Sequence, residues 1–411
     1  MFGFLGCKKK QEKQVNNRLE KKAADILGDP NYLAMSFGGY RLNSRDKQPS
    51  IEELKEDLRI LDAMGVHVLR TYNTAEFPHA ANLVEAIHQL NQEDPDFEMY
   101  VMLGAWINCK GAFTDTRDHD QEDEEQNARE INRAVELANQ YPEVVKMIAV
   151  GNEAMVMWAE SYYVHSWIIL KWVKHLQDLK ESGGLSKEVW ITSSDNFASW
   201  GGGSADYHVP SLRKLWEAVD FVSMHTYPMH DTHYNPQFWG VAEGEEELSK
   251  EASIEKAMIR ARDYAISQVD SVKKYMTDRG LSKPIHIGET GWASFSNSHY
   301  GNEGSRATDE YKEGLYYKMI RDWTNKQGMS CFYFEAFDEP WKDAANPGGS
   351  ENHFGLFKVD GTAKFPMWEA VDKGIFKGLS RGGKPITKTY GGDLKALLEE
   401  VELPAGSPQT N

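Results

Sequence analysis

The chain has 411 residues, enough for one large barrel with insertions or for two domains. Its formal net charge of −17, from 46 basic and 63 acidic residues, argues against nucleic acid and anionic membranes as partners and suits a neutral ligand. No stretch is long and apolar enough for a transmembrane helix, and three cysteines, an odd number, do not indicate a disulfide framework.

Short apolar segments alternate with amphipathic segments along the middle of the chain. The expected strands are residues 32–37, 67–72, 99–103, 144–150, 189–193, 221–225, 285–289 and 331–334. The expected helices are residues 50–64, 78–91, 118–141, 161–181, 253–279, 308–327, 367–374 and 393–400. Ser50 and Glu53 form a capping box at the start of the first helix, and the acidic run at 118–125 is interpreted as a solvated helix start.

Eight expected strands that alternate with helices predict one (β/α)8 barrel, an α/β fold of the TIM-barrel type. The barrel is expected to cover residues 30–377, after a charged lead-in at 1–29. Residues 378–411 are expected to form a tail that packs on the barrel or is partly loose. The glycines at 201–203 lack the spacing and the lysine of a phosphate-binding loop, so they are interpreted as a flexible rim.

The start of the chain leaves the location of the protein open. Residues 4–7 loosely resemble the lipid-attachment site of bacterial lipoproteins, but the apolar stretch before them is far shorter than a signal segment needs. We therefore expect an exported protein if the chain start is truncated and a cytoplasmic one otherwise.

Two of the expected strands end in the same way, with a glycine and a carboxylate. Residues 147–153 close on Gly-Asn-Glu, and residues 285–289 close on Gly-Glu. Because the carboxyl ends of all barrel strands open on one face, Glu153 and Glu289 are expected to meet there. Two facing carboxyl groups can cleave an acetal: one gives a proton to the leaving oxygen and the other attacks the anomeric carbon. We assign Glu153 as the acid/base and Glu289 as the nucleophile.

Four further side chains are expected beside these carboxylates. Asn152 precedes the acid and is suited to hold the sugar 2-hydroxyl, and the phenol of Tyr227 could orient Glu289. Arg70 and Tyr72 follow the second strand. Arg70 either orients the nucleophile or forms a structural ion pair, and the two interpretations have nearly equal weight.

The chain carries 12 tryptophans and 18 tyrosines, more rings than a barrel core alone needs, and rings at loop ends suit the faces of sugars. The aromatic residues near expected strand ends are Tyr40, Tyr72, Trp106, Trp158, Trp200, Trp239, Trp292, Tyr300 and Trp341. Packing in the core or at the rim is an equally good interpretation for any one of them. Trp292 and Trp341 are the best candidates for sugar stacking because they lie beside the motif residues.

Residues 151–153, 225–228, 289–292 and 334–342, each at an expected strand end and in this order, together resemble glycoside hydrolase family 17. That family comprises β-1,3-glucanases and glucan transglycosylases, which are retaining enzymes with a (β/α)8 barrel. The resemblance covers residues 32–368, and it implies retention of configuration, a β-1,3-linked glucan in an open groove, and neither a metal nor a cofactor.

The resemblance also implies a charge network after the eighth strand. It matches Glu339 and Lys342 to a glutamate and a lysine there, and Glu351 to a later glutamate of the same network. Two departures are visible: Ala293 stands where the family prefers proline, and the wide insert between Lys342 and Glu351 could reshape the groove.

Three alternatives remain open at this point. A β-1,3-glucanosyltransferase would use the same site, with a second sugar in place of water, and the sequence does not separate it from a hydrolase. A non-catalytic glucan-binding barrel should lack one of the carboxylates, and both are present. A metal-dependent isomerase or aldolase would need a strand-end lysine or a metal cluster, and the spacing of His225, His230 and His233 matches no standard zinc site. We expect a monomer whose partner is a β-glucan polysaccharide or oligosaccharide.

Overall fold

Eight parallel strands close into a barrel in the computed structural model of the chain, which describes residues 18–406. The barrel strands are β1 (Leu33–Ser36), β2 (Val66–Arg70), β3 (Tyr100–Ala105), β6 (Val145–Asn152), β7 (Trp190–Asn196), β8 (Val222–His225), β9 (Ile285–Gly291) and β10 (Cys331–Phe334). They lie side by side in chain order, and β10 pairs with β1 to complete the circle. The predicted (β/α)8 barrel is therefore confirmed.

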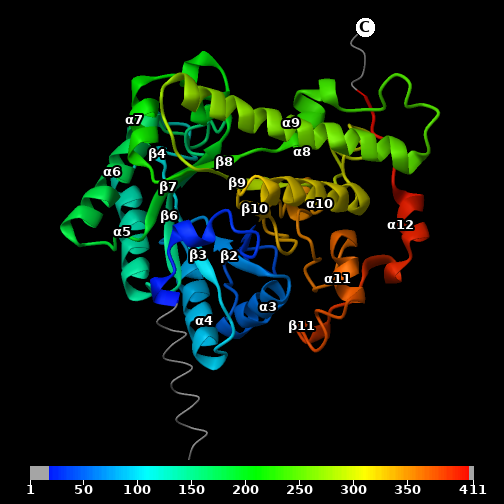
Figure 1. Ribbon diagram of the computed structural model, residues 1–411, viewed down its shortest axis with the longest axis horizontal. Coiled ribbons are helices and arrows are strands. Elements are labelled where there is room, and N and C mark those ends of the chain that lie inside the picture. The colour runs from blue at the N-terminus through cyan, green and yellow to red at the C-terminus, as the bar shows by residue number, and fades with distance from the viewer. Residues whose placement is uncertain (1–17, 407–411) are drawn as a thin grey trace, which may run out of the picture.

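Helices surround the barrel, and most of them cover the outer face of its strands (Figure 1). They are α2 (Ala23–Ile26), α3 (Ile51–Ala63), α4 (His79–Glu93), α5 (Glu124–Gln140), α6 (Ser166–Ser182), α7 (Pro210–Ala218), α8 (Pro228–Tyr234), α9 (Lys250–Asp278), α10 (Glu310–Lys326), α11 (Trp368–Asp372) and α12 (Leu394–Glu400). The capping box at the start of α3 is present: the amide of Glu53 donates to Ser50 Oγ, and the amide of Ser50 donates to the Glu53 carboxylate.

Two apolar cores hold the barrel together, because successive residues of a strand point to opposite faces of the sheet. Val68, Met102 and Met147 belong to the core that fills the barrel interior, together with Ala23 and Ile26 of α2. Their strand neighbours, for example Leu69 and Ile148, belong to the larger core beneath the helices. Both faces of each strand are thus buried, which is why the strands are apolar throughout.

The segment between β3 and α5 differs from its prediction. Residues 118–122 form a strand, β5 (Asp118–Glu122), which pairs antiparallel with β4 (Cys109–Lys110). The helix begins only at Glu124, where Asp123 caps it by accepting a hydrogen bond from the amide of Gln126. The acidic run is therefore divided between an exposed hairpin and a helix start. Residues 161–165 were likewise expected in α6 but lie in the loop that precedes it.

The glycines at 201–203 were expected to form a flexible rim, and this was wrong. Trp200 and Gly201 are buried in a helical turn after β7. Gly201 has φ of 96°, and a Cβ there would lie 2.4 Å from the ring of Tyr275 on α9. This glycine therefore permits close packing against α9. Helices α7 and α8 were not predicted.

The segment after α11 packs on the barrel through a buried ion pair. It contains a small hairpin, β11 (Ser380–Arg381) and β12 (Lys384–Pro385), and then α12. Arg381 Nε donates to Asp57 Oδ1 on α3 at 2.8 Å, and both side chains are almost completely buried. Arg41 contacts the same carboxylate at 2.9 Å. In α12, Leu397 is buried as well.

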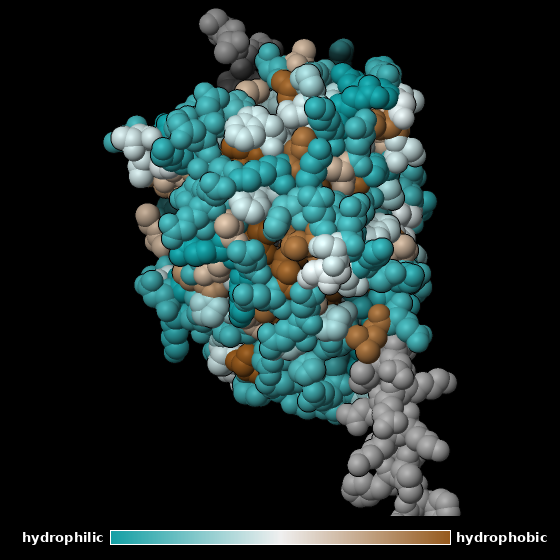
Figure 2. Space-filling model, turned by 90° about the vertical axis from the view of Figure 1, so that its left-hand side faces the viewer, coloured by the Kyte–Doolittle hydropathy of each residue, from teal (hydrophilic) through white to brown (hydrophobic). Residues whose placement is uncertain are grey.

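The side of the molecule that carries α5, α6 and α7 is largely hydrophilic, with small apolar areas near its middle (Figure 2). Among residues 18–406, no helix combines the length and the apolar character that a membrane crossing requires. Cys109 and Cys331 are buried and unpaired, while Cys7 and the lipoprotein-like stretch at 4–7 lie outside the described residues.

Candidate active site

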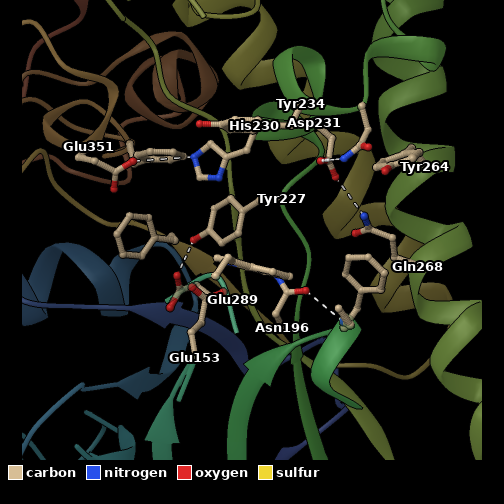
Figure 3. A pocket seen from close by; sticks show the side chains of 16 residues that line it. Glu153, Asn196, Tyr227, His230, Asp231, Tyr234, Tyr264, Gln268, Glu289 and Glu351 are labelled. Atoms are coloured by element: carbon tan, nitrogen blue, oxygen red, sulfur yellow. Dashed lines mark hydrogen bonds and ion pairs between the residues drawn. The ribbon is translucent and has the colours of Figure 1, made fainter. Parts of the chain in front are cut away.

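Glu153 and Glu289 line the same cavity at the carboxyl end of the barrel. Glu289 lies within β9, and Glu153 follows the last residue of β6. The cavity has a volume of about 680 Å³, and both carboxylates point into it (Figure 3). We call it the Glu153 cavity; its other walls include Trp158, Tyr227, Tyr234, Tyr264 and Gln268.

Three side chains hold the carboxylate of Glu289. Arg70 contacts Oε2, the hydroxyl of Tyr72 donates to Oε2 at 2.9 Å, and the hydroxyl of Tyr227 donates to Oε1 at 2.7 Å. Burial by itself raises the pKa of Glu289, but the charges of His225 and Arg70 and the hydrogen bond from Tyr227 outweigh it and lower the pKa to about 2. These contacts therefore hold Glu289 in its ionised form.

The guanidinium of Arg70 also joins the two strand ends. It is fully buried, and besides Glu289 it donates to Asn152 Oδ1 and to the carbonyl of Gly288. Arg70 thus fixes the amide of Asn152 beside the carboxylate. Both sequence interpretations of Arg70 fit this contact, since one ion pair supports the fold and orients Glu289.

Glu153 has a different environment. Its side chain is 27% exposed, compared with 11% for Glu289. One carboxylate oxygen lies 3.1 Å from Nδ1 of His225, whose Nε2 lies 2.8 Å from Ser194 Oγ. The backbone at Glu153 is left-handed, with φ of 45°, after Gly151 at 81°. From this turn the side chain extends into the Glu153 cavity (Figure 3).

A second cavity, of about 950 Å³, adjoins the first and shares Glu289, Phe334 and Glu351 with it. We call it the Trp341 cavity. Its walls carry rings and polar groups, among them Tyr40, Tyr72, Trp106, Phe113, Asn152, Trp341 and Lys342. Glu289 therefore lies between two cavities, while Glu153 lines only one of them.

Charged residues after β10 support the floor of the Trp341 cavity. Lys342 Nζ lies 3.4 Å from Glu335 and 3.7 Å from Glu339. Burial lowers the pKa of the Lys342 amine, but the charges of these two carboxylates outweigh it and raise that pKa. Burial also raises the pKa of Glu335 well above its usual range. Glu339 accepts hydrogen bonds from the amide of Tyr40 and from the indole of Trp341, which positions that ring.

The structure brings most of the expected site residues to these two cavities. Those that line a cavity or contact Glu289 are Arg70, Tyr72, Asn152, Glu153, Tyr227, Glu289, Glu339, Trp341, Lys342 and Glu351. Glu351 faces His230 at 3.8 Å.

Trp292 is not available for sugar stacking, and that expectation was wrong. Its side chain is completely buried, packs against Trp239 and Tyr316, and donates its indole N–H to the carbonyl of Ala307. Trp200, Trp239 and Tyr300 are buried as well. A tryptophan next to a strand-end motif can point down into the barrel wall, and the sequence does not show which way it points.

Other lining residues were not recognised from the sequence. Asn196 ends β7, and Tyr264 and Gln268 lie on α9, far from any strand end. Gln268 accepts from the hydroxyl of Thr226 and donates to Asp231. The sequence signal that could have revealed Gln268 is a polar residue on the otherwise apolar face of a long helix.

The three histidines of the 225–233 segment do not converge. His225 faces Glu153, His230 faces Glu351, and His233 stacks on His299 with ring centroids 4.1 Å apart. Within the described part of the chain, no three His, Cys, Asp or Glu side chains are grouped so that they could hold a metal ion. The site instead offers an ionised carboxylate beside a more exposed carboxyl, which is the donor set for acetal cleavage.

Comparison with known proteins adds independent evidence. Residues 34–355 match the family model for the BtgE/BtgC glycoside hydrolase domain. The solved structure of an endo-laminarinase from Formosa Hel1_33_131 is 63% identical in sequence; the match covers 95% of this chain and 99% of that one, with a TM-score of 0.93.

More distant relatives also match the chain. The glucan endo-1,3-beta-glucosidase btgC of Emericella nidulans is 23% identical over 320 residues, which are 75% of this chain and 40% of that protein. A glycoside hydrolase family 17 beta-1,3-glucanosyltransferase from Rhizomucor miehei is 20% identical with a TM-score of 0.56, over 82% of this chain and 96% of that one. The chain spans between 17% and 46% of the length of these five curated relatives.

Proposed function

The chain belongs to the BtgE/BtgC glycoside hydrolase domain family, and from that premise we propose that it is a retaining, endo-acting β-1,3-glucanase of laminarin-type glucan. The observation that carries the proposal is the pairing of Glu289, which is held ionised, with the more exposed Glu153 in one cavity. The endo-laminarinase that is 63% identical supports the substrate.

In the first displacement, Glu289 attacks the anomeric carbon of the sugar that lies over it. The glycosidic C–O bond breaks, and Glu153 gives its proton to the leaving oxygen. The charge of Arg70 and the hydroxyls of Tyr72 and Tyr227 keep Glu289 in the ionised form until the covalent bond forms. Asn152, held by Arg70, is placed to bind the 2-hydroxyl of the same sugar.

In the second displacement, Glu153 acts as a base. It removes a proton from water, and the water attacks the same carbon, which frees Glu289 and restores the original configuration. The exposure of Glu153 supports this exchange of proton and solvent, whereas the buried position of Glu289 keeps bulk water away from the nucleophile.

Two adjoining cavities support cleavage within a chain. Because Glu153 must reach the leaving oxygen, the leaving part of the glucan occupies the Glu153 cavity, and the part that becomes attached to Glu289 occupies the Trp341 cavity. Trp341 there offers a ring for the sugar faces, while Lys342 and Glu339 support the floor. Sugars on both sides of the cut are what an endo-acting enzyme requires.

Chemical rescue tests the two assignments. Glu289→Ala and Glu153→Ala should each lose most turnover on laminarin. With an aryl β-laminaribioside and azide, Glu289→Ala should yield the α-glycosyl azide, because azide replaces the nucleophile directly. Glu153→Ala should yield the β-azide, because azide attacks the intermediate on Glu289. Near-normal turnover of both variants, or a single azide anomer from both, would refute the roles.

The same site supports glucanosyl transfer as a second candidate. Trp158 and Tyr234, at the Glu153 cavity, are 58% and 64% exposed, which leaves rings free to hold an acceptor sugar. Mass analysis of products from linear β-1,3-gluco-oligosaccharides decides between the two. Products longer than the substrate mean transfer, and only shorter products mean hydrolysis. A non-catalytic binding barrel would give neither.

A further inference from the structure

A third cavity lies outside the two that hold the carboxylates. It has a volume of about 210 Å³ and is walled by the loop before α6 and the loop before α7. The amide of Met157, in the first loop, donates to the hydroxyl oxygen of Tyr207 in the second at 3.1 Å. In the first turns of α6 and α7, the hydroxyls of Ser166 and Ser211 lie 2.7 Å apart. We call this the Trp167 cavity.

An exposed tryptophan marks its edge. Trp167 is 46% exposed at the start of α6, and its neighbours Val209 and Met157 are 42% and 37% exposed. Single exposed apolar residues are ordinary, but three around one hollow form a patch, and patches of this kind mark binding sites. The side of the molecule that carries α6 and α7 is otherwise largely hydrophilic (Figure 2).

The polar groups of the cavity suit a neutral sugar. The carboxylate of Asp206 can accept hydrogen bonds from sugar hydroxyls, and the hydroxyls of Ser166 and Ser211 can both accept and donate them. The Tyr207 hydroxyl accepts a hydrogen bond from the amide of Met157, and none of the described residues accepts the hydrogen bond that this hydroxyl can donate. Small-molecule sites are usually at least about 300 Å³, so this smaller hollow suits one sugar ring and not an extended ligand.

The Trp167 cavity lies next to the leaving-group side of the catalytic groove. Met157 lines it, and the following residue, Trp158, lines the Glu153 cavity. Ala198 and Ser199 divide in the same way, since Ala198 faces the Glu153 cavity and Ser199 the Trp167 cavity. Both loops follow barrel strands at their carboxyl ends, so the two cavities open at the same end of the barrel.

We propose that the Trp167 cavity binds one glucosyl unit of the glucan polymer, beyond the leaving-group side of the catalytic groove. This inference rests on the proposed function, because the ligand is the substrate of that function. The ring of Trp167 stacks on the sugar face, and Asp206 and Tyr207 bind its hydroxyls. The Trp167 cavity thereby holds the polymer near the catalytic site, whereas oligosaccharides that fill only the groove do not reach this cavity.

The test uses the full chain with Glu289→Gln as a non-hydrolysing host. Retardation in native gels that contain laminarin is measured for the host, for the host with Trp167→Ala, and for the host with Trp167→Phe. Ile375→Ala is the control, because Ile375 is 38% exposed in the segment after α11 and lines none of the three cavities. In parallel, kcat/KM of the active Trp167→Ala enzyme is compared on laminarin and on laminaritetraose.

Trp167→Ala should weaken laminarin binding by about three- to tenfold, the range expected for one lost aromatic stacking contact, while Trp167→Phe keeps most of it. On laminarin the fall in kcat/KM should come from KM, and on laminaritetraose kcat/KM should not change. Unaltered retardation, or an equal loss on tetraose and polymer, would overturn the inference. So would a dimer that Trp167→Ala dissociates, because a second copy would then cover the cavity. A wild-type enzyme that neither binds nor cleaves laminarin would overturn the proposed function itself, and the inference with it.

Discussion

At the scale of single residues, the charge state of Glu289 depends on how completely its oxygens are occupied. Arg70 and Tyr72 contact one oxygen and Tyr227 the other, so each oxygen has a donor in the buried site. Hydrogen bonds to an ionised group are worth more than those between neutral groups, about 1.5–3 kcal/mol each. The loss of any one donor should therefore appear in the titration of the nucleophile.

We predict that Tyr227→Phe moves the acid limb of the kcat/KM–pH profile to higher pH. The variant removes the 2.7 Å hydrogen bond to Glu289 Oε1, so the pKa of Glu289 rises from about 2 and the nucleophile is protonated at a higher pH. Tyr264→Phe is the matched control, because Tyr264 lines the same cavity but its hydroxyl interacts with Asp231 and Gln268 and not with Glu153 or Glu289. An unchanged acid limb in Tyr227→Phe would contradict the prediction.

Glu289 should also make the stability of the fold depend on pH. Its pKa falls from 4.5 to about 2 on folding, so its contribution is complete above pH 4.5 and is lost as the pH falls towards 2. We predict that wild type loses about 3 kcal/mol more than Glu289→Gln between pH 6 and pH 2, by urea unfolding. Equal losses in the two proteins would show that Glu289 is not held ionised by the fold.

At the scale of elements, the sequence predicted those strands and helices that a regular pattern of apolar residues marks. All eight barrel strands and most of the helices follow from buried apolar runs and helical faces, although α7 and α8 were missed. The family 17 resemblance is confirmed by the family match and the relatives. The β4–β5 hairpin was missed because β5 is exposed and charged, so no apolar pattern marks it. The burial of Trp292 was missed because it depends on three elements packing around the ring.

The sequence could place the two carboxylates near each other but not describe the cavities around them. Strand-end position brought Glu153, Glu289, Arg70 and Tyr227 to one face. Gln268 reaches that face from the middle of α9, and the Trp167 cavity forms between two irregular loops. Such meetings are set by tertiary packing, for which local periodicity carries no signal.

The attachment of the C-terminal segment to α3 gives a stability prediction at this scale. Asp57→Ala should cost about 3–5 kcal/mol of unfolding free energy, because the guanidinium groups of Arg381 and Arg41 lose their shared buried carboxylate. The rate on laminarin at a temperature well below unfolding should be unchanged, since Asp57 lines neither catalytic cavity.

Lys395→Ala is the control for that measurement. Its ion pair with Glu399 is 4.0 Å long and both side chains are highly exposed, so the loss should be within error. If Asp57→Ala is no less stable than Lys395→Ala, the buried pair does not hold the segment.

At the scale of the whole molecule, negative charge surrounds the catalytic groove. The net charge is −17, and Glu76, Asp123, Asp231 and Glu351 are among the acidic residues that line the two cavities. A neutral glucan meets no electrostatic barrier there, whereas an anionic polysaccharide is repelled.

We therefore predict that substrate charge decides the effect of salt. Between 10 and 500 mM NaCl, kcat/KM on laminarin should change by less than about twofold, while kcat/KM on a carboxymethylated β-1,3-glucan should start low and rise, because salt screens the repulsion. Parallel salt responses for the two substrates would show that the charge of the groove does not select among glucans.

The left-handed backbone at Glu153 has a consequence for engineering. Any residue other than glycine costs about 1–2 kcal/mol in that conformation, and the chain nevertheless keeps glutamate there because only a side chain can extend from this turn into the groove. Glycine at this position would relieve the backbone and leave no proton donor for the leaving sugar. A search for heat-resistant variants that ranks substitutions by melting temperature alone would therefore select glycine at position 153, and the selected protein would be inactive.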